Sequence, residues 1–464
     1  MKKAVIRSVI LVIAAMFVLA VGTLFCLSIA GHDNASAPEG WNITLMMPEN
    51  AAIVTAVIMI VLAASSALLA AVLLISVIKI ELTARAEKKE NRKTRFTRLA
   101  SIDRQETEKG KENGRSSKTR PGAPETPFNI TLEEFTEGFR NFAAGQLGLF
   151  YDRSVIRTYV AAMAASRLTI LQGISGTGKT SLPYAFGKYV NNPAVVMPVQ
   201  PSWKDRSDLL GYYNEFTDSY TETEMLTQLY RANYDGKIYV IVLDEMNIAR
   251  VEYYFAEFLS LLELPDRTSR RIRVTSDSRP SDPELFEGGT LLLPDNVWFA
   301  GTANNDDSTL AISDKVYDRA FVIDLNSRAN PFPAASSGPS SITAAELQVL
   351  FEKAVADYPL SEQLRDRLFA ADKYLSERVG ISFGNRTMRQ LEKFVPVYIA
   401  AGGDEDQAAD TVICHKILRK MEGLNPVICR REAEGIRIEL RTLFGPGKLP
   451  ECEAYLDRII SGER

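Results

Sequence analysis

A glycine-rich stretch about a third of the way along the chain constrains its fold more than any other feature. Residues 173–180 read GISGTGKT and match the pattern G-x-x-x-x-G-K-[ST], and the short apolar run 167–172, RLTILQ, precedes them. Glycines let the backbone curl so that its N–H groups face an anion, and the N-terminus of a following helix adds positive potential. A strand, such a loop and a helix in succession predict an α/β fold with a phosphate-binding loop.

Two side chains of this loop carry the chemistry that we expect there. Lys179 can reach the β- and γ-phosphates of a nucleotide, and Thr180 can ligate Mg²⁺. Pro183 falls in the opening turns of the expected helix, where a proline costs least. The loop as a whole is expected to bind the phosphates through Gly173, Ile174, Ser175, Gly176, Thr177, Gly178, Lys179 and Thr180.

A second apolar run ends in two acidic residues. Residues 237–245 read KIYVIVLDE, a continuous β-branched run that is typical of a buried parallel strand. The carboxyl ends of such strands are where an α/β sheet presents its chemistry. We expect Asp244 to hold Mg²⁺ through water, and Glu245 to orient and deprotonate an attacking water. The alternative is a strand that merely ends in exposed acids, which the preceding phosphate-binding loop makes the weaker interpretation.

Two further strands are predicted beyond this point. Residues 296–304, NVWFAGTAN, are apolar, then small, and end in an amide. Asn304 can hold the attacking water or the γ-phosphate from the neighbouring strand. Arg319 directly precedes another strand, 321–325, and can project from the body of the protein.

These motifs, taken in order, resemble those of the AAA+ ATPases. The loop is followed by VLDEMN (242–247), GTANNDD (301–307) and DKVYDRA (314–320). The segments 200–211, QPSWKDRSDLLG, and 243–250, LDEMNIAR, are similar to the dynein-related group that contains the McrB-type restriction NTPases. The resemblance covers roughly residues 128–464. It implies a parallel sheet flanked by helices, a C-terminal helical lid, and ATP hydrolysis in a homo-oligomeric ring.

The resemblance also implies residue roles. It makes Lys179 and Thr180 the Walker A residues, Asp244 and Glu245 the Walker B residues, and Asn304 sensor 1. Arg319 matches the arginine finger that serves the nucleotide of the neighbouring subunit. Residues 383–389, FGNRTMR, resemble sensor 2, with Arg386 the better match and Arg389, one turn further, left open.

The chain departs from McrB-type proteins in two respects. Those proteins use GTP, whereas residues 304–307, NNDD, resemble the guanine-reading N-K-x-D pattern without its lysine. We therefore expect ATP with Mg²⁺. McrB also carries a DNA-binding domain before its motor, and here two apolar runs occupy that place, so restriction of modified DNA does not carry over.

Those apolar runs lead to a prediction of membrane attachment. Residues 9–30 and 51–78 contain no charge, and about 20 apolar residues suffice to span a bilayer as a helix. Basic residues flank both runs on their outer sides, whereas the loop 31–50 has no lysine or arginine. The positive-inside rule then predicts two transmembrane helices in a multi-pass cell-membrane protein whose main body lies in the cytoplasm. Residues 28–30, SIA, resemble a signal-peptidase site, so cleavage of the first run stays open.

The domain organisation follows from these assignments. We predict a membrane anchor at 1–83, a charged flexible linker at 84–127, an α/β nucleotide-binding domain at 128–342 and a helical lid at 343–464. The linker prediction rests on mixed charges, Gly, Ser and Pro with few apolar residues.

Composition narrows the choice of function. None of the four cysteines belongs to a C-x-x-C pair and only two histidines are present, so zinc chemistry and triad hydrolysis are not expected. His415, beside Cys414, is expected to be a lid residue with its hydrogen bonds satisfied. The net charge of −4 gives no basic field for nucleic acid. We expect a ring that remodels a protein partner. The alternatives are a nucleic-acid motor with a separate nuclease and a nucleotide-switched membrane scaffold.

Overall fold

The structure is a computed structural model of the 464-residue chain. It describes residues 60, 64, 67, 70–72, 74–83, 94–112, 130–304 and 309–462. The chain divides into two compact units, Met1–Lys93 and Thr94–Arg464. All the elements discussed below belong to the second unit.

The prediction of two transmembrane helices is corrected. Within the ranges just given, no helix is both long enough and apolar enough to cross a membrane, which contradicts that prediction and the multi-pass membrane location derived from it. Residues 9–30 lie outside the described residues, as does most of 51–78. Hydropathy and the placement of basic residues carried the prediction, and the fold that the structure describes is a mixed α/β fold with a parallel sheet.

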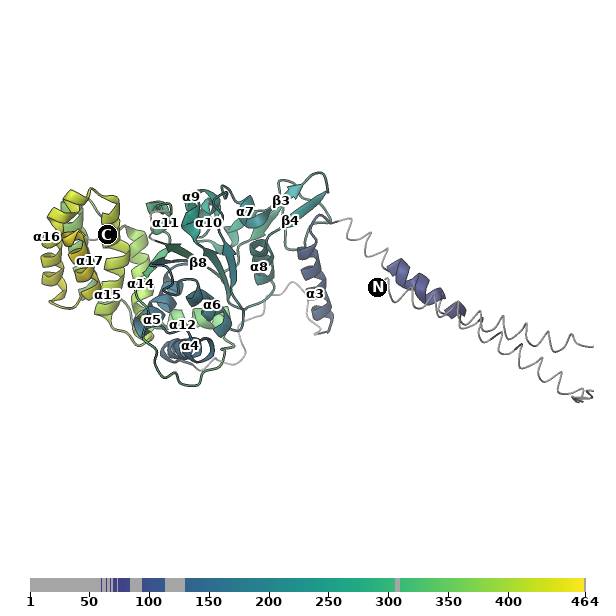
Figure 1. Cartoon of the computed structure of the whole chain (residues 1–464), viewed down its shortest axis with the longest axis horizontal. Helices are drawn as coiled ribbons and strands as arrows, with labels where there is room; N and C mark the ends of the chain where they lie inside the picture. Colours follow the sequence, from purple (N-terminus) through teal and green to yellow (C-terminus); the bar gives the residue numbers. More distant parts are fainter. Residues whose placement is uncertain are drawn as a thin grey trace, which may run out of the picture. The chain divides into compact units, whose positions relative to one another are not determined.

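A five-stranded sheet forms the centre of the second unit, in the order β2-β5-β8-β1-β9 (Figure 1). Every neighbouring pair is parallel. The strands are β1 (Leu168–Gly173), β2 (Val195–Pro198), β5 (Tyr239–Asp244), β8 (Val297–Asn304) and β9 (Phe321–Asp324). Because β8 lies between β5 and β1, the ends of these three strands meet at one edge of the sheet.

Both faces of the sheet are covered by helices, as the continuous apolar strands require. Side chains alternate along β5, so that Val240 and Val242 join one apolar core while Ile241 and Leu243 join the other. The helices of the first core are α4 (Leu132–Leu147), α5 (Arg153–Ala165), α6 (Ser181–Tyr189) and α12 (Ala344–Asp357). Those of the second are α7 (Ser207–Leu210), α8 (Glu224–Ala232), α9 (Val251–Tyr254) and α10 (Ala256–Leu261).

A group of helices, here called the lid, follows α12. It consists of α13 (Glu362–Val379), α14 (Asn385–Ala400), α15 (Glu405–Val412), the π-helical turn η3 (Ile413–Ile417), η4 (Leu418–Gly423), α16 (Pro426–Phe444) and α17 (Pro450–Ser461). The lid shares the first apolar core with the sheet, and Phe394 of α14 stacks on Phe321 of β9 with ring centroids 4.4 Å apart. The predicted boundary at residue 343 remains a prediction.

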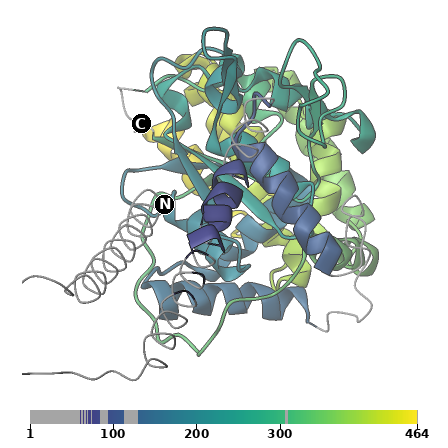
Figure 2. The same cartoon turned by 90° about the vertical axis from the view of Figure 1, so that its right-hand side faces the viewer.

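Two antiparallel hairpins lie outside the central sheet, and the first of them is at the end of the body away from the lid (Figure 1). One pairs β3 (Gly211–Asn214) with β4 (Ser219–Glu222), and the other pairs β6 (Arg271–Arg273) with β7 (Thr290–Leu292). Helix α3 (Arg98–Glu112) lies at the same end, which faces the viewer in Figure 2.

Residues 94–112 differ from the flexible linker expected there. Leu99 and Ile102 lie three apart on α3, Phe96 lies two residues before the helix begins, and all three side chains are buried. Phe96 stacks on Tyr220 of β4 with centroids 4.7 Å apart. Composition did not predict this packing, because charged residues dominate the segment. A few apolar residues are nevertheless enough to pack a short helix against the body of the protein.

A buried arginine holds the same segment in place. The Arg95 side chain is 1% exposed and lies 2.6 Å from the Asp277 carboxylate and 2.8 Å from that of Asp282. Further along α3, Asp103 accepts hydrogen bonds from the hydroxyls of Tyr230 and Tyr234. The segment is therefore joined to both the β6–β7 loop and α8.

Candidate functional site

The glycine-rich loop connects β1 to α6 and has a backbone that needs its glycines. Gly173 has φ +141°, and a Cβ there would come 2.3 Å from the Leu325 carbonyl oxygen. Gly176 has φ +80°, where only glycine is free of strain. The Lys179 Nζ folds back into the loop and donates to the carbonyls of Gly173 (3.0 Å) and Ile174 (2.8 Å). The loop is thus shaped as a cradle around its own lysine.

A cavity of about 460 Å³ opens above the loop. The structure brings Thr180, Asp244, Glu245 and Asn304 to its wall. Gly148, Leu149, Phe150 and Tyr151, from the connection between α4 and α5, line the rest together with Arg328 and Ala329. The cavity is large enough for a small-molecule ligand, and its polar groups converge from three strand ends.

The oxygen ligands in this cavity suit Mg²⁺. The Thr180 hydroxyl donates to Asp244 Oδ1 at 2.6 Å, so the two predicted metal ligands already lie side by side. Thr302 of β8 donates to the same carboxylate oxygen at 2.8 Å. Hydroxyl and carboxylate oxygens are the donors that Mg²⁺ prefers, so Thr180 and Asp244 fit this ion.

Thr302 also supports the second acidic residue. Glu245 has the left-handed backbone conformation, φ +53° and ψ +47°, which costs a non-glycine residue roughly 1–2 kcal/mol. Its N–H donates to the Thr302 hydroxyl at 2.8 Å. Sequence reasoning missed Thr302, because a threonine in a strand is ordinary. Its place between two acidic residues becomes visible only from the strand order.

Asn304 is held from the neighbouring loop. The Asn247 amide, in the buried turn after β5, donates to the Asn304 carbonyl at 3.0 Å. The predicted guanine-reading pattern begins at Asn304, but residues 305–308 lie outside the described part of the chain. The choice between ATP and GTP therefore stays a prediction.

Arg328 is a second residue that the sequence did not single out. It follows β9, and its Nε donates to the Gly176 carbonyl at 2.7 Å. It therefore adds a positive charge beside the loop, where phosphates would lie. No motif identifies it, because its position depends on how the chain leaves β9.

Arg319 and Arg386 lie at the other end of the strands, where the strands begin and not where they lead into the phosphate-binding loop. β9 runs parallel to β1, so Arg319, before β9, is separated from the loop after β1 by the length of a strand, about 13 Å. Arg319 Nε lies 3.0 Å from Glu263 Oε1, an ion pair without hydrogen-bond geometry. Arg386 pairs with the same oxygen. Both arginines thus pair with one carboxylate, that of Glu263, and neither contacts the phosphate-binding loop of its own chain.

A cavity of about 380 Å³ surrounds this pair. Basic residues dominate its lining: Arg167, Arg267, Arg270, Arg319, Arg386, Arg389 and Lys393, against the acids Glu263 and Asp295. Burial lowers the pKa of Arg167 to about 10, and burial followed by neighbouring arginines lowers that of Lys393. Arg167 Nη1 is buried without a hydrogen-bond partner among the described residues. The cavity can accept an anion.

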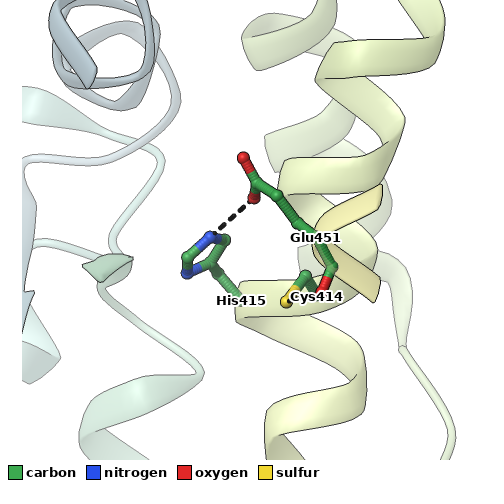
Figure 3. Close-up of side chains that lie close together, drawn as sticks. All are labelled: Cys414, His415 and Glu451. Atoms are coloured by element: carbon green, nitrogen blue, oxygen red, sulfur yellow. Dashed lines mark hydrogen bonds and ion pairs between the residues drawn. The ribbon is translucent and has the colours of Figure 1, made fainter. Parts of the chain in front are cut away.

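The lid contains a group of potential metal ligands, Cys414, His415 and Glu451 (Figure 3). His415 Nε2 lies 2.9 Å from Glu451 and Nδ1 lies 3.0 Å from Asp324 of β9. Burial alone would lower the pKa of His415, but the Asp324 charge and the bonds to both carboxylates raise it well above its ordinary value. The group is therefore an ion-paired link between lid and sheet.

Comparison with known proteins gives one sequence match. No protein-family model matches the chain. Over 193 residues it is 25% identical to the EcoKMcrB subunit of a Type IV methyl-directed restriction enzyme from Escherichia coli K12. The match covers 37% of this chain and 38% of that protein, so the chain spans well under half of this relative.

Two solved structures are similar at low TM-scores. A presumed ATPase from Cytophaga hutchinsonii has a TM-score of 0.43 at 12% identity, covering 66% of this chain and 92% of that one. A full-length MCM homologue from Methanopyrus kandleri has a TM-score of 0.38 at 13% identity, covering 64% of each chain. The similarity to the McrB subunit, together with a phosphate-binding loop on a parallel sheet, supports an AAA+ ATPase.

Proposed function

We propose that this chain hydrolyses ATP as a homo-oligomeric ring, in which Arg319 and Arg386 of one subunit complete the nucleotide site of the next. The position of Arg319 carries the proposal. It lies a strand's length from its own phosphate-binding loop, on the far edge of the sheet. A charge placed there is better suited to a nucleotide in a neighbouring chain than to one in its own loop.

The residues of the first cavity divide the work of hydrolysis. The loop would bind the phosphates, and Thr180 and Asp244 would hold Mg²⁺, which would supply positive charge against the phosphate oxygens. Glu245 orients the attacking water and accepts its proton, and Asn304 positions that water or the γ-phosphate. The strained backbone at Glu245 supports a catalytic role, since such strain is often stored at functional sites.

The basic cavity supports the trans arrangement. Glu263 holds both guanidinium groups in the isolated chain. A triphosphate carries more negative charge than one carboxylate, so in the ring it would draw Arg319 and Arg386 away from Glu263. The excess of basic side chains around them favours such an anionic visitor.

The substrate of the ring is proposed to be a protein that the motor remodels. A second candidate is a nucleic-acid motor that works with a nuclease, which the similarity to a restriction-enzyme subunit favours. Adding duplex DNA to a phosphate-release assay distinguishes the two candidate functions. Salt-dependent binding of DNA, together with stimulated phosphate release, would favour the second candidate. Phosphate release that DNA leaves unchanged at low salt would favour the first.

Mixing two inactive chains tests the ring. An Arg319→Ala chain should bind nucleotide but lose about 10³–10⁵ in rate, the range of trans-acting arginines. A Glu245→Gln chain should also bind nucleotide and fail, for lack of the base. In a mixed ring, some interfaces pair an intact Glu245 with an intact Arg319, so phosphate release should recover at intermediate ratios.

The control is subunit exchange, followed by energy transfer between labelled full-length chains. If exchange is shown and phosphate release stays at background at every ratio, Arg319 does not act in trans and the ring proposal is wrong. Each chain alone, carried through the same exchange, gives the background.

A further inference from the structure

The turn that carries Arg319 is held by two side chains from outside it. The turn joins α11 (Asp314–Tyr317) to β9. Lys416 Nζ donates to the carbonyls of Tyr317 (3.1 Å), Asp318 (3.3 Å) and Ala320 (2.6 Å). The remaining carbonyl, that of Arg319 itself, accepts from the Ser166 hydroxyl at 2.9 Å. Four consecutive carbonyls are thus fixed by side chains.

Lys416 comes from the lid and is an expensive residue to bury. It lies on the π-helical turn η3 and is 6% exposed. The charged groups that act on it are Asp318, whose carboxylate favours its positive charge, and Lys420 and Arg386, which oppose it. A methionine would fill the same space without the desolvation penalty of a charge. What a lysine adds is a donor that several carbonyls can share.

We propose that Lys416 is a positioning residue for Arg319. It fixes the backbone from which Arg319 projects toward the nucleotide of the neighbouring subunit, and so ties the trans arginine to the lid of its own chain. This inference rests on the proposed ring. It adds that the lid, and not only the sheet, sets the geometry of the active site next door.

The spacing of the contacts favours positioning over simple packing. A lysine that only joined lid to sheet could bond any exposed carbonyl, whereas Lys416 bonds the residues on both sides of Arg319. Lys420, one turn later, pairs at 3.1 Å with the Asp318 carboxylate and donates to the Ser382 carbonyl at 3.4 Å, whereas the carbonyls of the turn accept from Lys416 and Ser166. The two lysines therefore give a matched pair of variants: one releases the turn, and the other removes the same charge nearby.

Lys416→Met in the full-length chain is the first test. We expect kcat for phosphate release to fall about 10- to 100-fold, since a displacement near 1 Å in a catalytic group costs about 10² in rate. The nucleotide Kd should stay within about twofold, because the chain's own loop is intact. Lys420→Met should change kcat by less than about threefold. A purely structural role would instead weaken binding and rate together.

Mixed rings then show on which side of the interface the defect lies. When Lys416→Met is mixed with Glu245→Gln, the rate of phosphate release should exceed the weighted sum of the rates of the two chains alone. The reason is that Glu245 of the first chain meets an undisturbed Arg319 of the second. Lys416→Met mixed with Arg319→Ala should stay at the weighted sum, because both defects lie on the same side. The reference is the Arg319→Ala and Glu245→Gln pair.

The outcomes separate the two proposals. If the reference pair recovers and the Lys416→Met and Glu245→Gln pair does not, Lys416 acts within its own subunit and the positioning role is refuted while the ring stands. If the reference pair fails, the ring is refuted and the positioning role with it. Should Lys416→Met not fold, as a thermal melt would show, Ser166→Ala takes its place. It releases the Arg319 carbonyl, and we expect the same pattern with a roughly three- to tenfold loss in kcat.

Discussion

Replacing Thr302 by valine tests whether this threonine sets the geometry of the hydrolytic site. The change keeps the shape of a side chain that is 2% exposed and removes only its hydroxyl. That hydroxyl donates to Asp244 and accepts from the Glu245 amide, both at 2.8 Å. Valine therefore breaks both bonds, and leaves the strained backbone of Glu245 without its side-chain partner.

The size of the effect follows from these two bonds. A hydrogen bond to a charged group is worth about 1.5–3 kcal/mol. If the loss of the Asp244 bond appears fully in the transition state, the rate falls about 10- to 150-fold. The unpaired Glu245 amide adds a further penalty of about 1–3 kcal/mol, which should appear mainly as a lower thermal stability.

The assay is steady-state phosphate release at saturating nucleotide, repeated over a Mg²⁺ titration. Thr302→Val should lower kcat and raise the Mg²⁺ concentration needed for half-maximal rate. Thr136→Val is the matched control, since Thr136 is equally buried and its hydroxyl bonds only the Leu132 carbonyl in α4. If Thr302→Val keeps kcat within about threefold of the unaltered chain and the same Mg²⁺ dependence, Thr302 does not organise the site.

Two further predictions concern buried charges. Arg95→Met should lower the free energy of unfolding by about 3–5 kcal/mol, because it leaves Asp282, 5% exposed at its side chain, without its cation. Proteolysis within 94–112 should then become faster. An unchanged urea midpoint of unfolding would contradict a stabilising role for the buried ion pairs of Arg95. The raised pKa of His415 stabilises the fold fully below about pH 6.5, the ordinary value, and this stabilisation is lost as pH rises through the folded pKa. The difference in free energy of unfolding between the unaltered chain and His415→Gln should therefore shrink toward alkaline pH, and a pH-independent difference would refute the ion-paired imidazolium.

Much of the sheet was predictable from the sequence. Continuous β-branched runs are typical of parallel strands buried on both faces, so the strands at 167–172, 237–245, 296–304 and 321–325 match β1, β5, β8 and β9 to within two residues. The positions of the phosphate-binding loop and of Asp244 and Glu245 were predictable because each directly follows the end of a predicted strand. Their convergence follows once the strands are parallel, since all carboxyl ends then point the same way.

The rest of the candidate site depends on which strands are neighbours. Thr302 acts between two acidic residues only because β8 separates β5 from β1. Arg386 reaches Arg319 only because α14 meets the sheet at the edge where Glu263 lies. Local residue patterns carry little information about strand order or helix docking. Lys416 shows the same limit, because a single lysine in a helical pattern reads as exposed.

The contacts of Arg95, just before α3, also determine where mechanical tension would enter the second unit. Residue 94 is the point at which the chain leaves the unit Met1–Lys93. The next residue is bonded to the loop between β6 and β7 through its side chain, and to β4 through the bond from Tyr220 N–H to the Arg95 carbonyl at 2.7 Å. A pull on the upstream chain would therefore reach the second unit through β4 and through the loop between β6 and β7.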